Sequence, residues 1–439
     1  MAFGFKTLQN LQEKLAADSI KIPLAADVSP LFSERVIYGR RAANRIVIHP
    51  MEGCDGTPDG KPDDLTARRY TRFAQSGAGI IWFEAVSILP EARANPRQLY
   101  LHDGSAEDFR RLTEHIKQTC FRKNGYEPLI ILQATHSGRY AKPRGIPAPI
   151  IACHNTNFER ERPLPDSAIV TDDELRTAEQ RFGQTAKLAK ESGFDGIDIK
   201  ACHGYLLGEC LSAFTRPGPY GGSFENRTRL LKNAIQAASA HKSPGFFITA
   251  RIGAYDGFEY PYGFGARRDG QVGPDYAEAI TLCDLLREQY GLELVNITIG
   301  NPYQNPHVNR PYDSGISSPP ENPLGGVERL LNAARAVQKA VPSLSVTATG
   351  FSYLRQFGPN AAAAMLKQGD CAFAGFGRQA IAYPCFVEDL RERGALKPEK
   401  CCVTCSKCTQ LMRAGSAAGC VVRDSEVYLP LYKESVLKA

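Results

Sequence analysis

Three side chains that can donate a proton or a hydrogen bond lie close together in the stretch 193–207, Gly-Phe-Asp-Gly-Ile-Asp-Ile-Lys-Ala-Cys-His-Gly-Tyr-Leu-Leu. The alternation of apolar and polar residues up to Lys200 predicts a strand with one polar face. The chain then turns, with Gly204 available for unusual backbone angles, and brings Lys200, His203 and Tyr205 to one rim. Such a group suits acid–base chemistry. A buried strand leading into the start of a helix is the alternative interpretation.

The thirteen cysteines are unevenly distributed, and five of them crowd a short C-terminal window. Three follow C-x2-C-x2-C spacing and a fourth comes later, which gives the set Cys402, Cys405, Cys408 and Cys420. Thiolates at this spacing can hold three corners of a compact metal site that a distant fourth closes. Both iron–sulfur clusters and zinc accept four cysteines, so the residues alone leave iron–sulfur, zinc and unmetallated thiols open. A ligand set that includes Cys401 is the alternative.

The elements that must position these groups alternate between strand and helix. The predicted strands are residues 45–49, 79–83, 128–133, 194–200, 246–251, 292–298, 344–349 and 371–375. The predicted helices are residues 65–76, 106–121, 172–192, 225–241, 276–290, 327–341, 354–368 and 386–393. This alternation predicts an α/β protein whose parallel sheet closes into a (β/α)8 TIM barrel. An open doubly wound sheet is the alternative, but no G-x-G-x-x-G follows the first strand.

Length and composition suit one large domain with short additions. The chain has 439 residues, 43% of them hydrophobic, and a net charge of +6. We expect a lead-in over residues 1–35, the barrel over 36–395, and a cysteine-rich extension over 396–439. The mild charge does not call for nucleic acid. No apolar run is long enough to cross a bilayer and the start lacks a signal-peptide core, so we expect a cytoplasmic protein without membrane contact.

Several segments resemble the Old Yellow Enzyme-like NADH:flavin oxidoreductases, a family of FMN-binding (β/α)8 barrels. The segments are residues 44–51, 133–139, 193–207, 211–212, 220–227, 251–252 and 377–378. The resemblance is most specific between residues 193 and 227. It implies an FMN cofactor, with NAD(P)H as the reductant.

The resemblance also implies which positions contact FMN. Gln133 offers a donor and an acceptor to the pyrimidine edge, and Arg251 a fixed cation near the N1/O2 region; taken alone, Arg251 could equally be a structural ion-pair partner. The loops after the last two strands would hold the phosphate, as in many barrels. The implied contacts are Pro50, Met51, Ala85, Gln133, Arg251, Gly350, Phe351, Gly375, Gly377 and Arg378.

The resemblance further implies an ene-reductase, which transfers hydride from reduced flavin to an alkene conjugated to a carbonyl or carboxylate. Tyr205 matches the proton-donating tyrosine of the family, and a pKa near 10 keeps it protonated at neutral pH. Many ene-reductases have His at position 200 and His or Asn at position 203, where they hold the substrate oxygen. Lys200 would favour a carboxylate or a developing enolate beside His203. Alternatively, Lys200 pairs with Asp198 or points at flavin O2.

One subset of the family, similar to 2,4-dienoyl-CoA reductase and trimethylamine dehydrogenase, carries a [4Fe–4S] cluster just after the barrel with near-identical cysteine spacing. This favours iron–sulfur over zinc at Cys402, Cys405, Cys408 and Cys420. Those relatives continue into a nucleotide-binding module that we expect to be absent here. Electrons for a cluster would then come from a separate protein or a neighbouring subunit of a homo-oligomer.

Two other functions compete with the ene-reductase. Amine oxidation that passes electrons out through the cluster would need an aromatic cage for a cation, and the charge of Lys200 disfavours it. An RNA-modifying barrel or a pure binding module is disfavoured because no basic cluster with interleaved aromatic residues is present. The sequence does not identify the substrate, choose between NADH and NADPH, or fix the oligomeric state.

Overall fold

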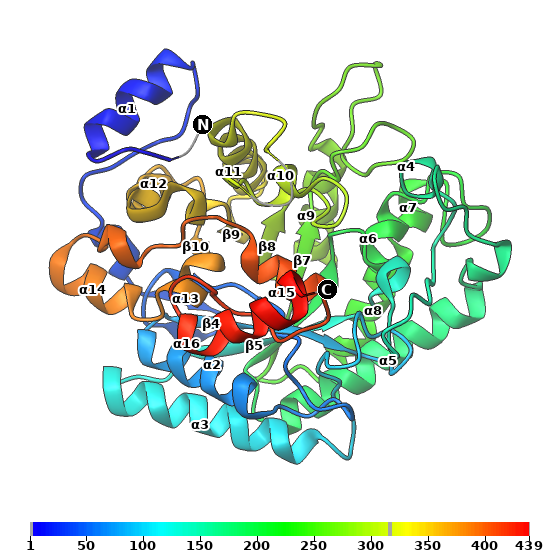
Figure 1. The fold of residues 1–439 in the computed structure, drawn as a ribbon. Coiled ribbons are helices and arrows are strands. Elements are labelled where there is room, and N and C mark those ends of the chain that lie inside the picture. Colours follow the sequence, from blue (N-terminus) through cyan, green and yellow to red (C-terminus); the bar gives the residue numbers. More distant parts are fainter. Residues whose placement is uncertain (1–2, 315–317, 439) are drawn as a thin grey trace.

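The computed structural model describes residues 3–314 and 318–438. Eight parallel strands form a closed barrel in the order β10-β3-β4-β5-β6-β7-β8-β9 (Figure 1). The strands are β3 (Ile46–Ile48), β4 (Ile80–Ser87), β5 (Leu129–Thr135), β6 (Gly196–Ala201), β7 (Phe247–Gly253), β8 (Leu294–Thr298), β9 (Ser345–Ala348) and β10 (Phe373–Phe376). Each coincides with a strand predicted from the sequence. The predicted (β/α)8 barrel is therefore confirmed, and the open sheet is excluded.

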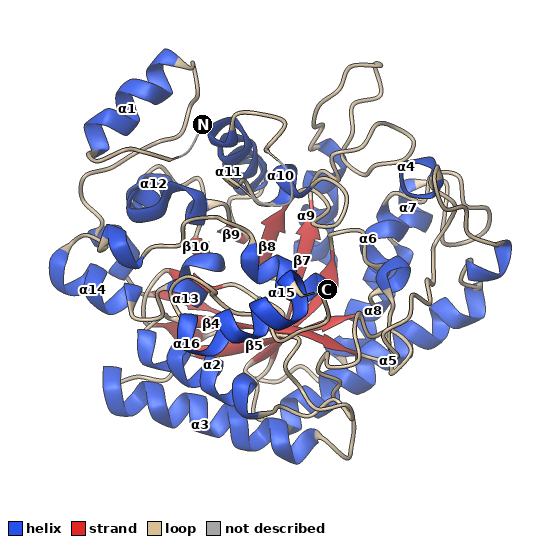
Figure 2. Cartoon of the chain, viewed as in Figure 1, coloured by secondary structure: helices blue, strands red, loops and turns tan. Residues whose placement is uncertain are grey.

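Helices surround the strands on the outside of the barrel (Figure 2). They are α2 (Asp64–Ser76), α3 (Ala106–Asn124), α5 (Asp172–Glu191), α8 (Arg229–Ser239), α9 (Ala277–Tyr290), α11 (Pro323–Ala340), α12 (Gly358–Lys367) and α14 (Phe386–Arg393). The start of α5 is a capping box, because the Thr171 hydroxyl accepts from the Glu174 amide while the Glu174 carboxylate accepts from the Thr171 amide.

Two predicted helices are interrupted in the structure. The predicted helix 225–241 is divided into α7 (Phe224–Arg227) and α8, with Thr228 between them. The predicted helix 354–368 begins as a 3-10 segment containing Arg355 at a φ of 48°. An α-helix cannot continue through that left-handed conformation, so α12 begins only at Gly358.

An antiparallel hairpin, β1 (Arg35–Ile37) and β2 (Arg40–Ala42), closes the amino-terminal end of the barrel. Its apolar residues pack against side chains that fill the barrel interior, including Trp82 and Phe247. Tyr38 at the hairpin turn stacks on Phe247, with ring centroids 4.6 Å apart, and its hydroxyl donates to the Ile248 carbonyl oxygen over 2.7 Å. This end of the barrel is a packed apolar plug.

The N-terminal segment packs against the barrel. Helix α1 (Leu8–Ala17) contributes Leu11 and Leu15 to the main apolar core, and Phe3 joins them. The Phe3 ring lies edge-on to Tyr353, with centroids 5.8 Å apart. In the described ranges, 3–314 and 318–438, no helix has the length and apolarity of a membrane span.

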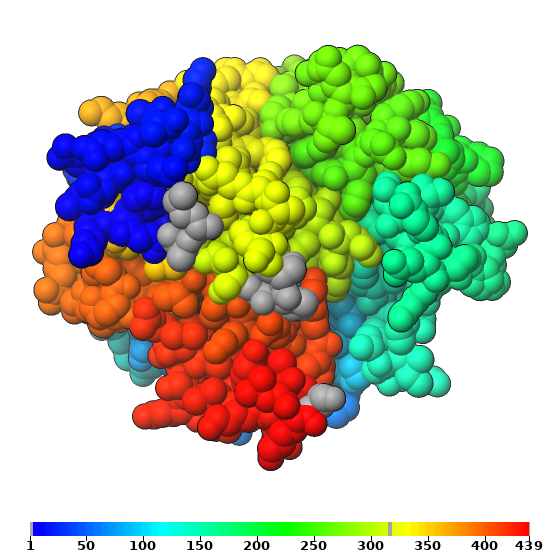
Figure 3. Space-filling view, turned by 45° about the horizontal axis from the view of Figure 1, so that its top comes forward, coloured from blue at the N-terminus to red at the C-terminus, as the bar shows by residue number. Residues whose placement is uncertain are grey.

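The C-terminal extension follows α13 (Arg378–Ala382) and α14 and contains α15 (Lys407–Arg413) and α16 (Ser425–Tyr432). It forms a compact patch on one face of the molecule, red in Figure 3. Arg68 and Arg72 of α2 both pair with Asp424. The Ala418 amide donates to the Gly53 carbonyl oxygen over 2.6 Å, so the extension is attached to the loop that follows the first barrel strand. The remaining short helices are α4 (Thr156–Glu159), α6 (Leu206–Leu211) and α10 (Pro306–Asn309).

Candidate active site

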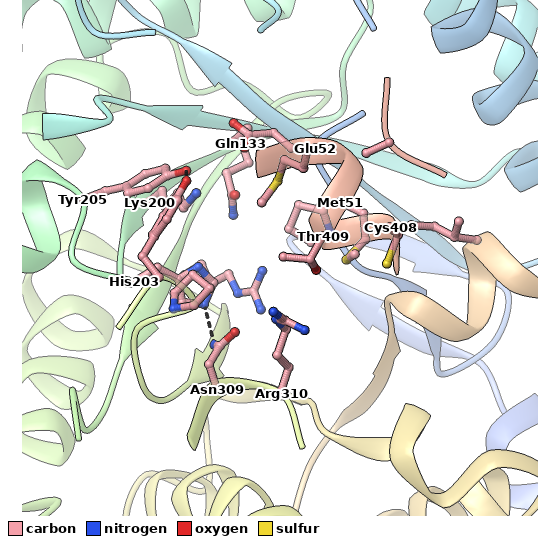
Figure 4. A pocket seen from close by; sticks show the side chains of 18 residues that line it. Met51, Glu52, Gln133, Lys200, His203, Tyr205, Asn309, Arg310, Cys408 and Thr409 are labelled. Atoms are coloured by element: carbon pink, nitrogen blue, oxygen red, sulfur yellow. Dashed lines mark hydrogen bonds between the residues drawn. The ribbon is translucent and has the colours of Figure 1, made fainter. Parts of the chain in front are cut away.

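Two neighbouring cavities lie at the carboxyl ends of the strands, on the side of the barrel opposite the hairpin. The first, which we call the reaction cavity, is lined by Lys200, His203 and Tyr205 together with predicted cofactor residues. Figure 4 shows Tyr205 and Lys200 on one side of it and Met51 and Cys408 on the other. The predicted residues in its lining are Pro50, Met51, Ala85, Gln133, Lys200, His203, Tyr205 and Arg251.

Lys200 lies against the face of Tyr205 in the reaction cavity. Its Nζ is 3.7 Å from the centroid of the Tyr205 ring, which is a cation–π distance. The alternative pairing of Lys200 with Asp198 does not occur among the described residues; Asp198 Oδ2 instead accepts from Trp82 Nε1 at 2.7 Å and Gln133 Nε2 at 2.6 Å. Burial lowers the pKa of Lys200, while the nearby Glu52 opposes that shift.

His203 is held as a neutral donor. It has a φ of 66°, a left-handed conformation that directs its ring back toward the strand ends. Burial, with Arg251 and Lys200 nearby, lowers its pKa well below the ordinary value. Its Nε2 lies 3.0 Å from Asn309 Nδ2, which also donates to the Ile299 carbonyl oxygen. Because the amide nitrogen is a donor, His203 Nε2 accepts and Nδ1 carries the proton.

Tyr205 belongs to a group of three tyrosines. Its hydroxyl is 3.0 Å from the Tyr303 hydroxyl, and the Tyr303 ring stacks on Tyr140 with centroids 3.9 Å apart. Burial and the nearby Glu52 raise the pKa of Tyr205 well above its ordinary value. Tyr205 therefore remains protonated at neutral pH.

Several buried polar atoms at this end of the barrel have no partner within the described protein. Three of them belong to residues that line the cavities: His49 Nε2, Arg251 Nε and Arg378 Nη1. Buried polar atoms are normally hydrogen-bonded, so a polar group brought in by a ligand would satisfy them. Arg251 is 7% exposed and makes no ion pair among the described residues, so it is not the structural ion-pair partner that was the alternative. The donors fit the polar edge of a flavin ring.

The second cavity, which we call the phosphate cavity, shares Pro50, Met51, His203 and Arg251 with the first. The residues that line only this cavity include Gly350, Gly377 and Arg378, as predicted, and Thr349 and Ser352, which sequence analysis missed; Arg310, also missed, lines both cavities. Burial and the neighbouring Arg378 lower the pKa of Arg310 to about 10. Arg310 and Arg378 both line this cavity, and two guanidinium groups in one cavity suit a doubly charged phosphate.

Two predicted phosphate residues lie elsewhere. Phe351 is fully buried in the main core, and neither it nor Gly375 lines the two cavities. A Cβ on Gly375 would come within 1.6 Å of His49 Nε2, so glycine is required there for packing. The role of Phe351 and Gly375 in FMN binding stays a prediction.

The four predicted cysteine ligands line one small cavity in the extension, beside Arg378. The Cys402 sulfur accepts from the Thr404 amide at 3.4 Å and the Cys420 sulfur from the Arg423 amide at 3.3 Å, while burial raises the pKa of both thiols. In the described part of the chain, no three Cys, His, Asp or Glu side chains are gathered closely enough for a single metal ion. Cys401 lies apart from the cavity, and its sulfur donates to the Lys397 carbonyl oxygen. The set Cys402, Cys405, Cys408 and Cys420 shares this cavity without Cys401, and which cysteines would hold a metal stays a prediction.

Loops far apart in the sequence supply the residues that sequence analysis missed. Glu52, Tyr303 and Arg310 line the reaction cavity, together with Met412 from the extension. Tyr303 and Arg310 lie in the long segment after the sixth barrel strand, and no sequence motif marks either residue.

The parallel barrel, with two polar cavities at the carboxyl ends of its strands, has its ligand-binding residues where barrel enzymes commonly place them. The chain belongs to the NADH:flavin oxidoreductase / NADH oxidase family, whose model matches residues 38–266. Its relatives include the NADPH dehydrogenase of Bacillus pumilus, which is 31% identical over 274 residues, 62% of this chain and 73% of that protein. The family establishes an FMN-dependent NAD(P)H oxidoreductase.

Two solved structures share the fold. A 2-naphthoyl-CoA reductase complex superposes with a TM-score of 0.74 at 20% identity, over 90% of this chain and 57% of that one. Histamine dehydrogenase from Rhizobium sp. 4-9 gives a TM-score of 0.67 at 19% identity, over 90% of this chain and 52% of that one. The chain thus spans little more than half the length of these two proteins.

Proposed function

We propose that this protein is an ene-reductase that reduces an alkene conjugated to a carbonyl or carboxylate. The observation that carries the proposal is the convergence of Lys200, His203 and Tyr205 on the same cavity as Gln133 and Arg251. When bound, FMN supplies the hydride. The cavity is also the natural place for the substrate, because its donors and its protonated tyrosine face one space.

The side chains divide the remaining work between them. His203 Nδ1–H and the Lys200 ammonium donate to the substrate oxygen, where negative charge develops as hydride arrives at the β-carbon. Tyr205 gives its hydroxyl proton to the α-carbon. Gln133 and Arg251 would hold the pyrimidine edge of the flavin, and Arg310 with Arg378 its phosphate.

Replacing Tyr205 with phenylalanine tests the assignment. The variant should reduce alkenes about 10²- to 10⁴-fold more slowly, the usual contribution of a general acid. Anaerobic stopped-flow absorbance would measure the flavin reduction by NAD(P)H and its reoxidation by an enone or enoate separately. Only the second step should slow. An equal loss in both steps would count against the role of Tyr205, and a wild-type protein that reduces no activated alkene would refute the proposed function.

We further propose a [4Fe–4S] cluster at Cys402, Cys405, Cys408 and Cys420. Support comes from the common cavity, the amide–sulfur contacts and the position of Cys408, which lines both this cavity and the reaction cavity. Cys402→Ser should lose iron and sulfide after anaerobic purification, whereas Cys401→Ser should retain both because Cys401 lies outside the cavity. Equal iron content in the two variants, or stoichiometric zinc in the wild type, would contradict the cluster.

Amine oxidation is the second candidate. Cys408 in the wall of the reaction cavity would suit electrons leaving through a cluster to an external protein, and the three tyrosines offer aromatic faces for a cation. The Lys200 ammonium opposes a cationic substrate. Flavin bleaching by amines without NAD(P)H would establish this activity, and absence of bleaching across primary to tertiary amines would remove it.

A further inference from the structure

Tyr303 separates the reaction cavity from a second opening on the rim of the barrel, which we call the outer cavity. The outer cavity is lined by Ala94–Pro96 and by residues 139–147 of the loop after β5, and Arg413 of the extension adds a cation. It shares three side chains with the reaction cavity: Glu52, Tyr303 and Met412. Tyr303 thus borders both spaces.

Tyr205 has no direct access to the outer cavity. Its side chain is 3% exposed and it does not line that cavity. Within the described residues, its hydroxyl is hydrogen-bonded to the Tyr303 hydroxyl, with 3.0 Å between the two oxygens. A catalytic acid that has given up its proton must recover one before the next turnover. Tyr205 lines the reaction cavity, so while substrate or product fills that cavity the hydrogen-bonded route from Tyr205 to water runs through Tyr303.

Lys200 is placed to stabilise the deprotonated form of Tyr205. A phenolate on Tyr205 would be a buried charge, which is costly unless it is compensated. The Lys200 ammonium is 3.7 Å from the centre of the ring and is itself 5% exposed. It can stabilise the phenolate during the interval before reprotonation.

We propose that Tyr303 is a proton relay that restores Tyr205 after each turnover with protons drawn from water in the outer cavity. The inference rests on the proposed function. The O–H bond of Tyr205 breaks as its proton moves to the α-carbon, leaving a phenolate. The O–H bond of Tyr303 then breaks and its proton bonds to the Tyr205 oxygen. Water in the outer cavity then gives a proton to Tyr303 and re-forms its hydroxyl; the hydroxide left behind is neutralised by the bulk solvent, so each turnover takes up one solvent proton.

The stacked pair orients the relay. The Tyr303 ring lies on Tyr140 with an interplanar angle of 17°, and the amide of Asn301 holds both residues. Asn301 Nδ2 donates to the Tyr140 hydroxyl over 2.7 Å, and Asn301 Oδ1 accepts from the Tyr303 amide over 2.9 Å. The Tyr140 hydroxyl is engaged by Asn301 and has no hydrogen bond to Tyr205 among the described residues. It therefore offers a matched control.

The test compares one turnover with many in the holoenzyme. In the Tyr303→Phe variant, pre-reduced enzyme mixed with an enone should be reoxidised within about twofold of the wild-type rate, because Tyr205 still carries its own proton. Steady-state reduction of the same enone should fall at least about tenfold. Tyrosinate absorbance in the ultraviolet should persist after the first turnover in this variant and not in the wild type. Tyr140→Phe removes only the hydroxyl and keeps both the stacked ring and the Asn301 contact to the Tyr303 amide, so all three measurements should be unchanged.

Three outcomes overturn the relay. The first is a Tyr303→Phe enzyme with wild-type steady-state turnover and no tyrosinate signal. The second is an equal loss of single and multiple turnover, which would show a structural role. The third is a Tyr205→Phe enzyme with full single-turnover activity, since Tyr303 would then protonate the substrate directly. A wild-type enzyme that reduces no enone refutes the proposed function instead.

Discussion

The two ends of the barrel interior differ in composition: one is filled by apolar side chains, and the other carries buried polar groups. At the hairpin end, apolar side chains such as Trp82 and Phe247 fill the space, and Tyr38, which packs against them, has its hydroxyl satisfied. At the carboxyl end, buried atoms of His49 and Arg251 have no partner in the described protein. The packed hairpin end therefore contributes mainly to stability. The carboxyl end contributes mainly to ligand binding, because buried polar groups without partners oppose folding until a ligand engages them.

The largest expected effect is the loss of stability on substitution of Phe247 at the hairpin end. Phe247→Ala removes a ring that is 1% exposed and stacked on Tyr38, and should lower the free energy of unfolding by about 3–5 kcal/mol. Urea denaturation followed by circular dichroism measures the loss. FMN affinity of the folded variant should be unchanged, because the residue lies at the far end of the barrel. A weakened FMN affinity would show that the two ends are not independent.

Asp198 lies between the two ends, hydrogen-bonded to Trp82 and to Gln133, and should make stability depend on pH. Burial raises the pKa of Asp198 from 3.8 to about 6, while hydrogen bonds from Gln133 and Trp82 oppose the shift. Between about pH 4 and 6 the folded protein keeps a proton that the unfolded chain releases, so the free energy of unfolding falls as pH rises, by about 3 kcal/mol across the window. Urea denaturation of FMN-free Asp198→Asn should lack this contribution. Identical pH dependence in variant and wild type would contradict it.

A substitution of Arg251 tests the contribution of the carboxyl end to FMN binding. Arg251→Met should raise the Kd for FMN about 10- to 100-fold, the worth of a hydrogen bond to a charged group. Flavin fluorescence titration of the FMN-free protein measures the change. Arg45 begins the first barrel strand near the hairpin end and donates to the Ala372 carbonyl oxygen. Arg45→Met should leave the Kd unaltered, and equal weakening in both variants would mean that Arg251 acts through the fold.

The sequence predicted the barrel because each strand is a short apolar run followed by an independent helix, so the signal is local. Gln133 and Arg251 could be placed at strand ends for the same reason. The hairpin 35–42 escaped prediction because its apolar residues are few, and it is held by burial under the barrel.

The site residues that loops contribute were harder to predict from the sequence. Tyr303 and Arg310 reach the site only through the path of a long segment, which no spacing rule describes. Phe351 and Gly375 were placed by analogy with the positions after the last two strands. In the structure the side chain of Phe351 turns into the core and Gly375 makes room for His49.

Helix α15 has a consequence for how this type of enzyme can diversify. It carries Thr409 and Met412 into the wall of the reaction cavity, yet none of the proton-handling groups belongs to it. Selection for a new substrate could therefore act on the extension alone, reshaping the chamber while the catalytic apparatus of the barrel is inherited intact.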